Sequence, residues 1–205
     1  MVSSAATPKG ERRRQALVAS AAELLLEGGF DAVRHRAVAT RADLPLASTT
    51  YYFDSLDDLI ACAVELNGNA DMEAMRARVA AVTQRRRGAE STVELLVELL
   101  LGDEEKRPES RERLISRYER FVACARHPAL RDVQLRLRAQ LDDLLTDALR
   151  RSGRSAPEGG QLRRLVAMVD GAMITALGGS TTRTHGGLAR GGMLLESIDV
   201  MAPPV

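Results

Sequence analysis

Apolar residues recur at helical spacing along almost the whole chain. Leu17, Ala21 and Leu24 fall on one side of a helix expected from about position 8 to 27, and the same spacing returns over residues 129–151. No stretch shows the strict alternation of apolar and polar residues that predicts a half-buried strand. The pattern therefore predicts an all-α protein.

Two short helices joined by a tight corner are expected over residues 38–53. Val38, Ala39 and Ala42 share one face at helical spacing, and Asp43-Leu44-Pro45 then interrupts the helix. Aspartate tolerates the left-handed backbone that a sharp corner needs, and a residue before proline is pushed out of helical geometry. Since proline is tolerated in a first helical turn, the second helix is expected over residues 46–53.

The second short helix carries hydroxyl side chains, which can reach the phosphates and base edges of DNA. These are Ser48, Thr49, Thr50, Tyr51 and Tyr52. Arg34 and Arg36 stand at the start of the preceding helix, where free backbone N–H groups also favour a phosphate. Arg12, Arg13 and Arg14 near the N-terminus are either a phosphate clamp or a solvated helix start.

Residues 28–65, GGFDAVRHRAVATRADLPLASTTYYFDSLDDLIACAVE, resemble the DNA-binding domain of the tetracycline-repressor (TetR) family of transcriptional regulators. The most specific matches are Gly29-Phe30, Val38-Ala39, Tyr51-Tyr52-Phe53 and Asp57-Asp58-Leu59. Three residues depart from the family pattern. Asp43 replaces the usual corner glycine, Thr50 replaces the first tyrosine, and Leu56 replaces a phosphate-contacting lysine.

The resemblance implies an N-terminal three-helix DNA-binding domain with a helix-turn-helix, followed by a larger helical ligand-binding and dimerisation domain. We expect a flexible tail over residues 1–9, the DNA-binding domain over 10–54 and the second domain over 55–205. The expected function is that of a ligand-responsive regulator, a repressor rather than an activator. It would bind a near-palindromic operator in double-stranded DNA as a homodimer and be released by a small-molecule inducer.

The DNA-contacting residues are predicted from the resemblance and from the hydroxyl pattern together. Phosphates would be held by Arg34, Arg36, Thr50, Tyr51 and Tyr52. Bases would be read by Ala47, Ser48, Thr49 and Tyr51.

The helix expected over residues 161–177 is apolar on two faces, which is more than one packing partner within a subunit needs. Family members dimerise through their last two long helices, so we expect an interface here, with an ordinary internal core as the alternative. The predicted interface residues are Leu162, Leu165, Val166, Val169, Met173, Ala176, Met193, Leu194 and Ile198.

The resemblance also implies a ligand chamber among the central helices. Because aromatic residues make up only 3% of the chain, an aliphatic pocket is expected rather than an aromatic stacking cage. Core packing is the alternative for each candidate residue. The candidates are Met75, Arg117, Tyr118, Phe121, Cys124, Met168 and Asp170.

Two polar stretches in the middle of the chain are expected to bend or end helices. Asn67-Gly68-Asn69 is expected to bend or end a helix, because glycine and asparagine are poor helix formers. Arg85-Arg86-Arg87 is expected to close a helix over residues 72–86, with a second DNA-contacting patch as the alternative.

Charge is nearly balanced, with 29 basic and 28 acidic residues, so composition alone does not indicate nucleic-acid binding. Cys62 and Cys124 are isolated, and no metal-ligand spacing or glycine-rich phosphate loop occurs, so no metal or cofactor is expected. The N-terminus has no secretory signal and no window is long and apolar enough to span a membrane. We therefore expect a cytoplasmic protein.

Two other classes of function are alternatives. An enzyme is disfavoured because no nucleophile with a base is evident, and His35, His127 and His185 are far apart in the sequence. A helical small-molecule-binding dimer that has lost sequence-specific DNA binding is the closer alternative, because Leu56 replaces the lysine.

Overall fold

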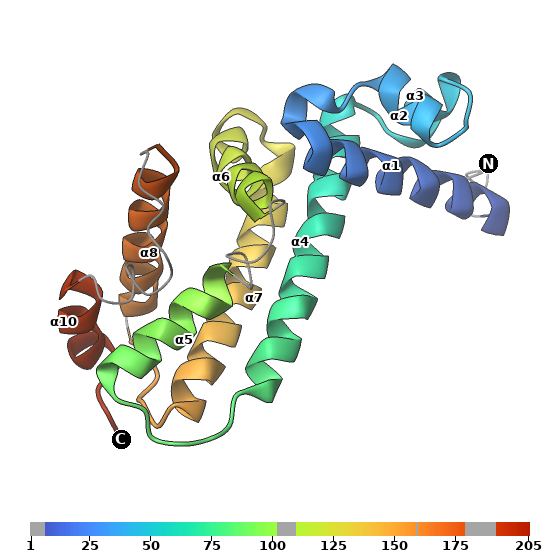
Figure 1. The fold of residues 1–205 in the computed structure, drawn as a ribbon. Helices are drawn as coiled ribbons and strands as arrows, with labels where there is room; N and C mark the ends of the chain where they lie inside the picture. Colours follow the sequence, from blue (N-terminus) through green and yellow to red (C-terminus); the bar gives the residue numbers. More distant parts are fainter. Residues whose placement is uncertain (1–6, 102–109, 159, 179–191) are drawn as a thin grey trace. The chain divides into compact units, whose positions relative to one another are not determined.

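The computed structural model describes residues 7–101, 110–158, 160–178 and 192–205 (Figure 1). Among these residues there is no strand, and a single isolated bridge joins Arg154 to Pro204. The all-α prediction is confirmed. The helices are α1 (Pro8–Ala32), α2 (His35–Arg41), α3 (Ala47–Tyr52), α4 (Leu56–Ala81), α5 (Ala89–Leu101), α6 (Ser110–Arg126), α7 (Ala129–Arg151), α8 (Gln161–Gly178) and α10 (Gly192–Met201).

The internal contacts of the chain divide it into two compact units. Unit 1 comprises residues 1–71 and 112–137, and unit 2 comprises residues 72–111 and 138–205. Unit 1 thus holds α1 to α3 together with the first part of α4 and most of α6. The predicted domain boundary between residues 54 and 55 stays a prediction.

The N-terminal helix of unit 1 begins as its sequence predicts. Thr7 caps α1 by accepting a hydrogen bond from the Gly10 N–H on its hydroxyl oxygen (3.1 Å), and Pro8 occupies the first turn. Because α1 starts at Pro8, Pro8 and Lys9 belong to the helix and not to a flexible tail, whereas residues 1–6 lie outside the described residues. Gly28 and Gly29 interrupt the helix near its end, and Gly29 adopts a φ of 65°.

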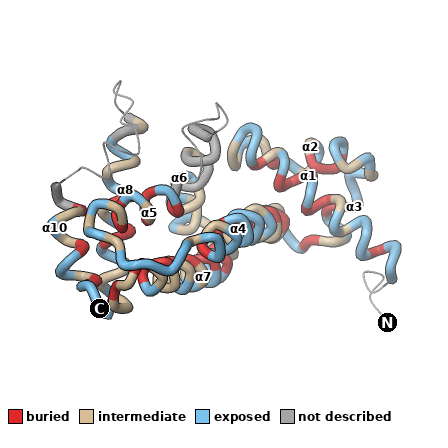
Figure 2. Tube along the Cα trace, turned by 60° about the horizontal axis from the view of Figure 1, so that its bottom comes forward, coloured by how far each residue is buried: buried red, intermediate tan, exposed pale blue. Residues whose placement is uncertain are grey.

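The core of unit 1 is made by the inward faces of α1, α2 and α4, where Leu17, Val38 and Leu59 are fully buried (Figure 2). Ser55 caps α4: its hydroxyl donates to the Asp58 carboxylate (2.8 Å) and accepts the Asp58 N–H (3.1 Å). This cap follows directly after α3. The start of α4 is therefore fixed close to the end of the second short helix.

The expected break at Asn67-Gly68-Asn69 is wrong, since α4 runs through it without interruption. The Asn67 side chain donates to the Ala22 carbonyl of α1 (3.0 Å). A Cβ on Gly68 would lie 2.3 Å from Leu137 Cδ1 of α7. Both residues serve helix packing, which overrides their low helix propensity.

Unit 2 packs α5, α8, α10 and the second part of α7 around Val97, Leu145 and Ile198. A charged residue closes this core: Arg154 is only 2% exposed. Its guanidinium donates to Thr92 Oγ1 (3.0 Å), Asp199 Oδ1 (2.7 Å) and the Ala202 carbonyl (2.9 Å). These bonds join α5, α10 and the C-terminal segment.

The helix predicted over residues 72–86 ends earlier, because α4 ends at Ala81 and the next helix begins at Ala89. The arginines of the intervening segment therefore do not form a helix end. Instead, the Arg85 N–H donates to the Arg151 carbonyl and the Arg87 N–H to the Ser152 carbonyl (both 3.0 Å). The segment caps the C-terminus of α7.

Within the described ranges, no helix combines the length and the apolar character that a membrane span requires.

Candidate functional site

The corner between α2 and α3 has the geometry that its sequence predicts. Asp43 adopts a φ of 51°, and among the described residues it is the one non-glycine residue with a positive φ. The Asp43 N–H donates to the Thr40 carbonyl (3.2 Å) and the Leu44 N–H to the Ala39 carbonyl (3.0 Å), which ends α2. Aspartate thus fills the position of the family's glycine at a modest conformational cost.

A buried hydroxyl fixes α3 against α2. Thr49 is 0% exposed, and its hydroxyl donates to the Leu46 carbonyl (2.8 Å). Its oxygen lies 2.9 Å from His35 Nδ1. Because the hydroxyl proton is already used, the His35 Nδ1–H must be the donor in this contact. The structure corrects the predicted role of Thr49, since a buried side chain bonded on both sides cannot reach a base.

The opposite side of α3 faces solvent. Ala47 and Thr50 are exposed, Tyr51 is 59% exposed, and Ser48 and Tyr52 are half-buried. The Tyr51 and Tyr52 rings meet edge to face with centroids 4.9 Å apart. Thr50 and Tyr51 thus lie on the solvent side of α3, where the Thr50 hydroxyl donates to the Ala47 carbonyl (3.3 Å).

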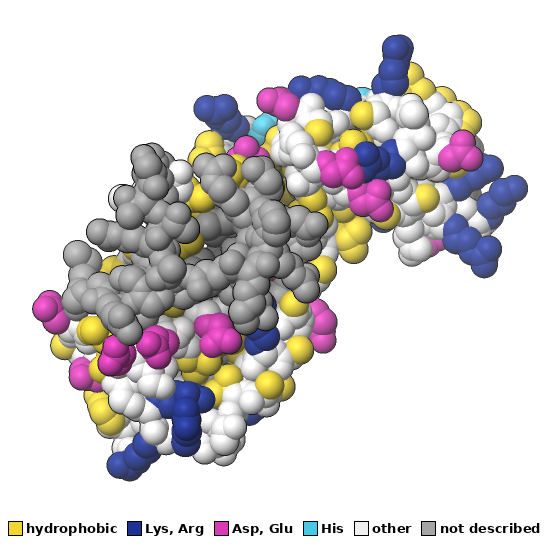
Figure 3. Space-filling view, in the orientation of Figure 1, with side chains coloured by type: hydrophobic (Ala, Val, Ile, Leu, Met, Phe, Trp, Pro, Cys, Tyr) yellow, Lys and Arg dark blue, Asp and Glu magenta, His cyan; other side chains and the backbone are white. Residues whose placement is uncertain are grey.

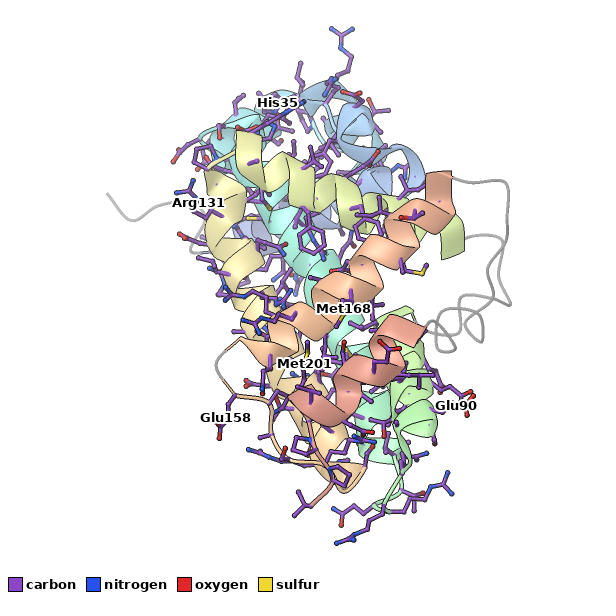
Figure 4. The ribbon with its side chains drawn as sticks, turned by 90° about the vertical axis from the view of Figure 1, so that its left-hand side faces the viewer. His35, Glu90, Arg131, Glu158, Met168 and Met201 are labelled. Atoms are coloured by element: carbon purple, nitrogen blue, oxygen red, sulfur yellow. The ribbon has the colours of Figure 1, made fainter. Side chains whose placement is uncertain are left out.

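The two predicted phosphate-binding arginines differ in what they contact. Arg34 is the N-cap residue of α2, and its guanidinium donates to Asp31 (3.1 Å) and to the Val33 carbonyl (3.2 Å). Arg36 is exposed and forms no ion pair with any described residue. Arg36 is consequently the more accessible cation at the start of α2. His35, which separates them in the sequence, is labelled in Figure 4.

Two further arginines connect α2, and the residue after α3, to the neighbouring helices α1 and α4. Arg41 of α2 makes two 2.6 Å hydrogen bonds to Glu27 of α1, and this bonding lowers the pKa of the Glu27 carboxyl and raises the pKa of Arg41. Arg14 lies over the Phe53 ring, 5.2 Å from its centroid, and donates to Cys62 Sγ (3.5 Å). Arg14 therefore contacts the residue that follows α3 and a residue of α4, while Arg12 and Arg13 are exposed. Nothing in the local sequence distinguished Arg14 from its two neighbours.

Most of the predicted dimer-interface residues lie inside unit 2 itself. Leu165, Val166 and Val169 of α8 are buried, and so are Leu194 and Ile198 of α10, whereas Leu162 and Met173 are half-buried. The apolar surface of the five buried residues is covered within unit 2 by α5, α7 and each other, and their part in a dimer interface stays a prediction. The side chains of Ala176 and Met193 lie outside the described residues.

The predicted ligand-pocket residues fall in both units. Met75, Met168 and Asp170 belong to unit 2, where Met75 is buried and the other two are half-buried. Met168 is labelled on α8 in Figure 4, and its sulfur accepts from the Ser197 hydroxyl of α10 (3.8 Å). Tyr118, Phe121 and Cys124 belong to unit 1, where all are half-buried, and the side chain of Arg117 lies outside the described residues. Burial raises the pKa of the Cys124 thiol.

Unit 2 contains a small apolar cavity that does not involve the predicted pocket residues. Its free volume is about 10 Å³, far below the ~300–1,000 Å³ of typical ligand pockets. A ligand would therefore need the surrounding helices to separate. The lining residues are Val93, Leu96, Val97, Leu100, Leu145, Leu162, Leu165, Val166, Val169 and Leu194.

Among the described residues, no group of three or more His, Cys, Asp and Glu side chains is placed to hold a metal ion.

Residues 87–193 match the family model described as "Tetracyclin repressor-like, C-terminal domain", which spans just over half of the chain. The fold is similar to the multidrug binding protein EbrR complexed with imidazole (26% identity, 96% of each chain covered, TM-score 0.69). It is also similar to EbrR complexed with proflavin (28% identity, 91% of this chain and 99% of that chain, TM-score 0.69). A TetR transcription regulator from Haloarcula marismortui shares the fold at 18% identity (94% and 99% covered, TM-score 0.66). No curated protein sequence matches the chain.

Proposed function

Because the chain belongs to the tetracycline-repressor (TetR) family of transcriptional regulators, we propose that it is a ligand-responsive repressor. It binds a near-palindromic operator as a homodimer and leaves the DNA when a small molecule binds. Two helix-turn-helix pairs related by a two-fold axis would meet half-sites about one helical turn apart, ~34 Å, or a multiple of it.

The exposed side of α3 is the observation that carries this proposal. Tyr51 and Ala47 project from a helix whose other side is held by the buried Thr49. Ala47, Ser48 and Tyr51 read base edges in the major groove, and Thr50, Tyr52, Arg34 and Arg36 hold phosphates. Leu56 supplies no charge where the family has lysine, so Arg36 carries more of the phosphate binding.

We place the dimer interface on the exposed stripe of α8 instead of its buried one. Ala167 and Gly171 are exposed, and Ile174 is 54% exposed, at the helical spacing of a single face. A Cβ on Gly171 would meet no described atom within 4 Å, so a second helix has room to approach closely. A large apolar residue beside two small ones suits helix-on-helix packing.

The inducer site is proposed to open from the apolar centre of unit 2. Its cavity is lined only by aliphatic residues, which favours an apolar inducer. EbrR binds imidazole and proflavin in its structures, and we propose that this chain likewise accepts small ring compounds with an apolar surface. Such a ligand would shift the population toward a helix arrangement, and hence a half-site spacing, that does not fit the operator.

A gel-shift assay on the DNA upstream of the chain's own coding sequence tests operator binding. We expect binding that weakens steeply as salt rises, because phosphate contacts release counterions. Tyr51→Ala should weaken it at least about tenfold, the effect of losing one good base contact. Leu66→Ala, which changes another exposed residue of unit 1, is the matched control and should leave affinity unchanged.

A helical small-molecule-binding dimer without sequence-specific DNA binding is the second candidate. Leu56 favours it, because one phosphate contact of the family is missing. This candidate is selected over the first by two results together. The wild type binds the upstream DNA and random DNA with equal affinity, and Tyr51→Ala binds both as well as the wild type does.

A further inference from the structure

A group of arginines in unit 2 is used neither by the proposed DNA contacts nor by the proposed inducer site. Arg85, Arg86 and Arg87 come from the segment after α4, and Arg150 and Arg151 end α7. The backbone bonds from Arg85 and Arg87 to the end of α7 hold the two segments side by side. In Figure 1 they meet at the lower edge of the picture, and Figure 3 shows Lys and Arg side chains gathered there.

The two segments border an open depression of the size of a small molecule. Its volume is about 320 Å³, within the ~300–1,000 Å³ of typical ligand sites. Gly153 adopts a φ of 70° at its edge, and a Cβ there would lie 2.9 Å from Arg86 Cγ. The glycine therefore lets Arg86 lie against the loop. The lining residues are Gln84, Arg85, Asp147, Arg150, Arg151 and Gly153.

Among the side chains that line this depression, the basic groups outnumber the acidic ones. Asp147 is the single carboxylate in the lining, and Arg151 already bonds to it (2.8 Å) and to the Ala80 carbonyl (3.4 Å). Arg85 and Arg150 are exposed and bond through their side chains to no described residue. Three lining arginines against one aspartate give a net charge of +2, and the neighbouring Arg86 raises it to +3.

The negative end of the α7 dipole offsets only part of this positive charge. A helix C-terminus carries about half a negative charge. The carbonyls of Arg151 and Ser152 already accept the amides of Arg85 and Arg87. The exposed guanidinium groups of Arg85, Arg86 and Arg150 repel one another weakly in water, and a bound anion would turn that repulsion into attraction.

We propose that this basic depression binds a small anion with several phosphate groups, such as pyrophosphate or the phosphate chain of a nucleoside triphosphate. Guanidinium groups pair with phosphate oxygens through two parallel hydrogen bonds, and several phosphates satisfy several arginines at once. The Gln84 side chain lines the same depression and supplies a neutral donor. Phosphate chains are favoured over a peptide because the site is a depression the size of a small molecule and not an extended groove.

Isothermal titration calorimetry on the full-length chain tests the site with two probes, pyrophosphate and ATP. We expect one anion per chain, with affinity that falls as salt rises. The double variant Arg85→Ala/Arg150→Ala should weaken binding at least about tenfold. Losing the hydrogen bonds of even one guanidinium to a phosphate lowers the affinity by about that factor. Arg126→Ala/Arg131→Ala removes two exposed arginines of unit 1, outside the depression, and should change affinity less than about twofold.

The two probes also separate the sources of the phosphate. Equal affinity for pyrophosphate and ATP assigns the site to the phosphate chain alone, and tighter binding of ATP assigns it to nucleotides. The proposal is overturned if neither probe binds at about 1 mM, or if both double variants behave alike. It is also overturned if an oligoglutamate peptide binds and both phosphate probes do not. Failure of the gel-shift assay would leave this result untouched, since no DNA is present.

Discussion

Arginine supplies nearly all of the positive charge of this chain, and burial decides what each arginine does. Two of the 29 basic residues, Lys9 and Lys106, are lysines, which leaves 27 arginines. Arg154 is fully enclosed, and Arg136 forms an exposed ion pair with Glu65 (2.6 Å). Arg154 is therefore an example of a buried structural arginine, and Arg136 is an example of a solvent-exposed one.

Replacing Arg154 by alanine should destabilise unit 2 strongly. The change leaves Thr92 Oγ1 and the Ala202 carbonyl without their buried partner, so we expect a loss of about 2–4 kcal/mol in the free energy of unfolding. Arg136→Ala is the control, with an expected loss below about 1 kcal/mol because its ion pair is exposed. Urea unfolding followed by circular dichroism measures both. Equal losses for the two variants would show that Arg154 does not close the core.

The local sequence predicts the conformation of some residues, but it does not predict which of two similar neighbours is buried. Asp43 could be placed in a left-handed corner because it precedes Leu44-Pro45, and its φ of 51° agrees. Thr49 could not be separated from Thr50 in the same way. Adjacent hydroxyls on a short helix look equivalent in sequence, and only the packing of α3 against His35 buries one and exposes the other.

At the scale of a helix, α4 shows how packing overrides propensity. Two asparagines and a glycine predict a break at residues 67–69, yet α4 continues through them, and contacts made by Asn67 and Gly68 explain why those two residues stand there. Asn67 bonds to α1, and Gly68 lies against Leu137 of α7. Both contacts are between residues far apart in the chain, so a pattern read over a few positions does not contain them.

Gly68→Ala should therefore destabilise unit 1, although alanine is the better helix former. The new Cβ would lie 2.3 Å from Leu137 Cδ1, and overpacking of this kind costs about 1–3 kcal/mol, more than the ~1 kcal/mol gained in propensity. Leu137→Ala alone should cost about 2–5 kcal/mol, and the double variant should lose less than the sum. Thermal unfolding of the three variants measures this coupling. A Gly68→Ala protein more stable than wild type would contradict the close contact.

At the scale of the whole molecule, the sequence of α8 predicts more apolar surface than one partner covers, and the side of the helix that would meet a second subunit stays a prediction. The sequence shows that the helix has more apolar surface than one partner needs, and it does not show which face meets the subunit's own core. In the structure, Val166 and Val169 face α5 and α10, which leaves Ala167, Gly171 and Ile174 exposed. The choice depends on tertiary contacts with α10 and α5, which no local pattern encodes.

Ile174→Arg should consequently convert a dimer into a monomer, since it places a charge in the middle of the proposed interface. Burying an unpaired guanidinium costs several kcal/mol, enough to weaken the dimer by at least about a hundredfold. Leu135→Arg is the matched control: Leu135 is 63% exposed on α7, Ile174 is 54% exposed, and the control should stay dimeric in sedimentation equilibrium. Because each operator half-site contributes only half of the contacts, the monomeric variant should also lose operator binding with its α3 unchanged. If Ile174→Arg and Leu135→Arg sediment alike as dimers, the exposed stripe of α8 is not the interface.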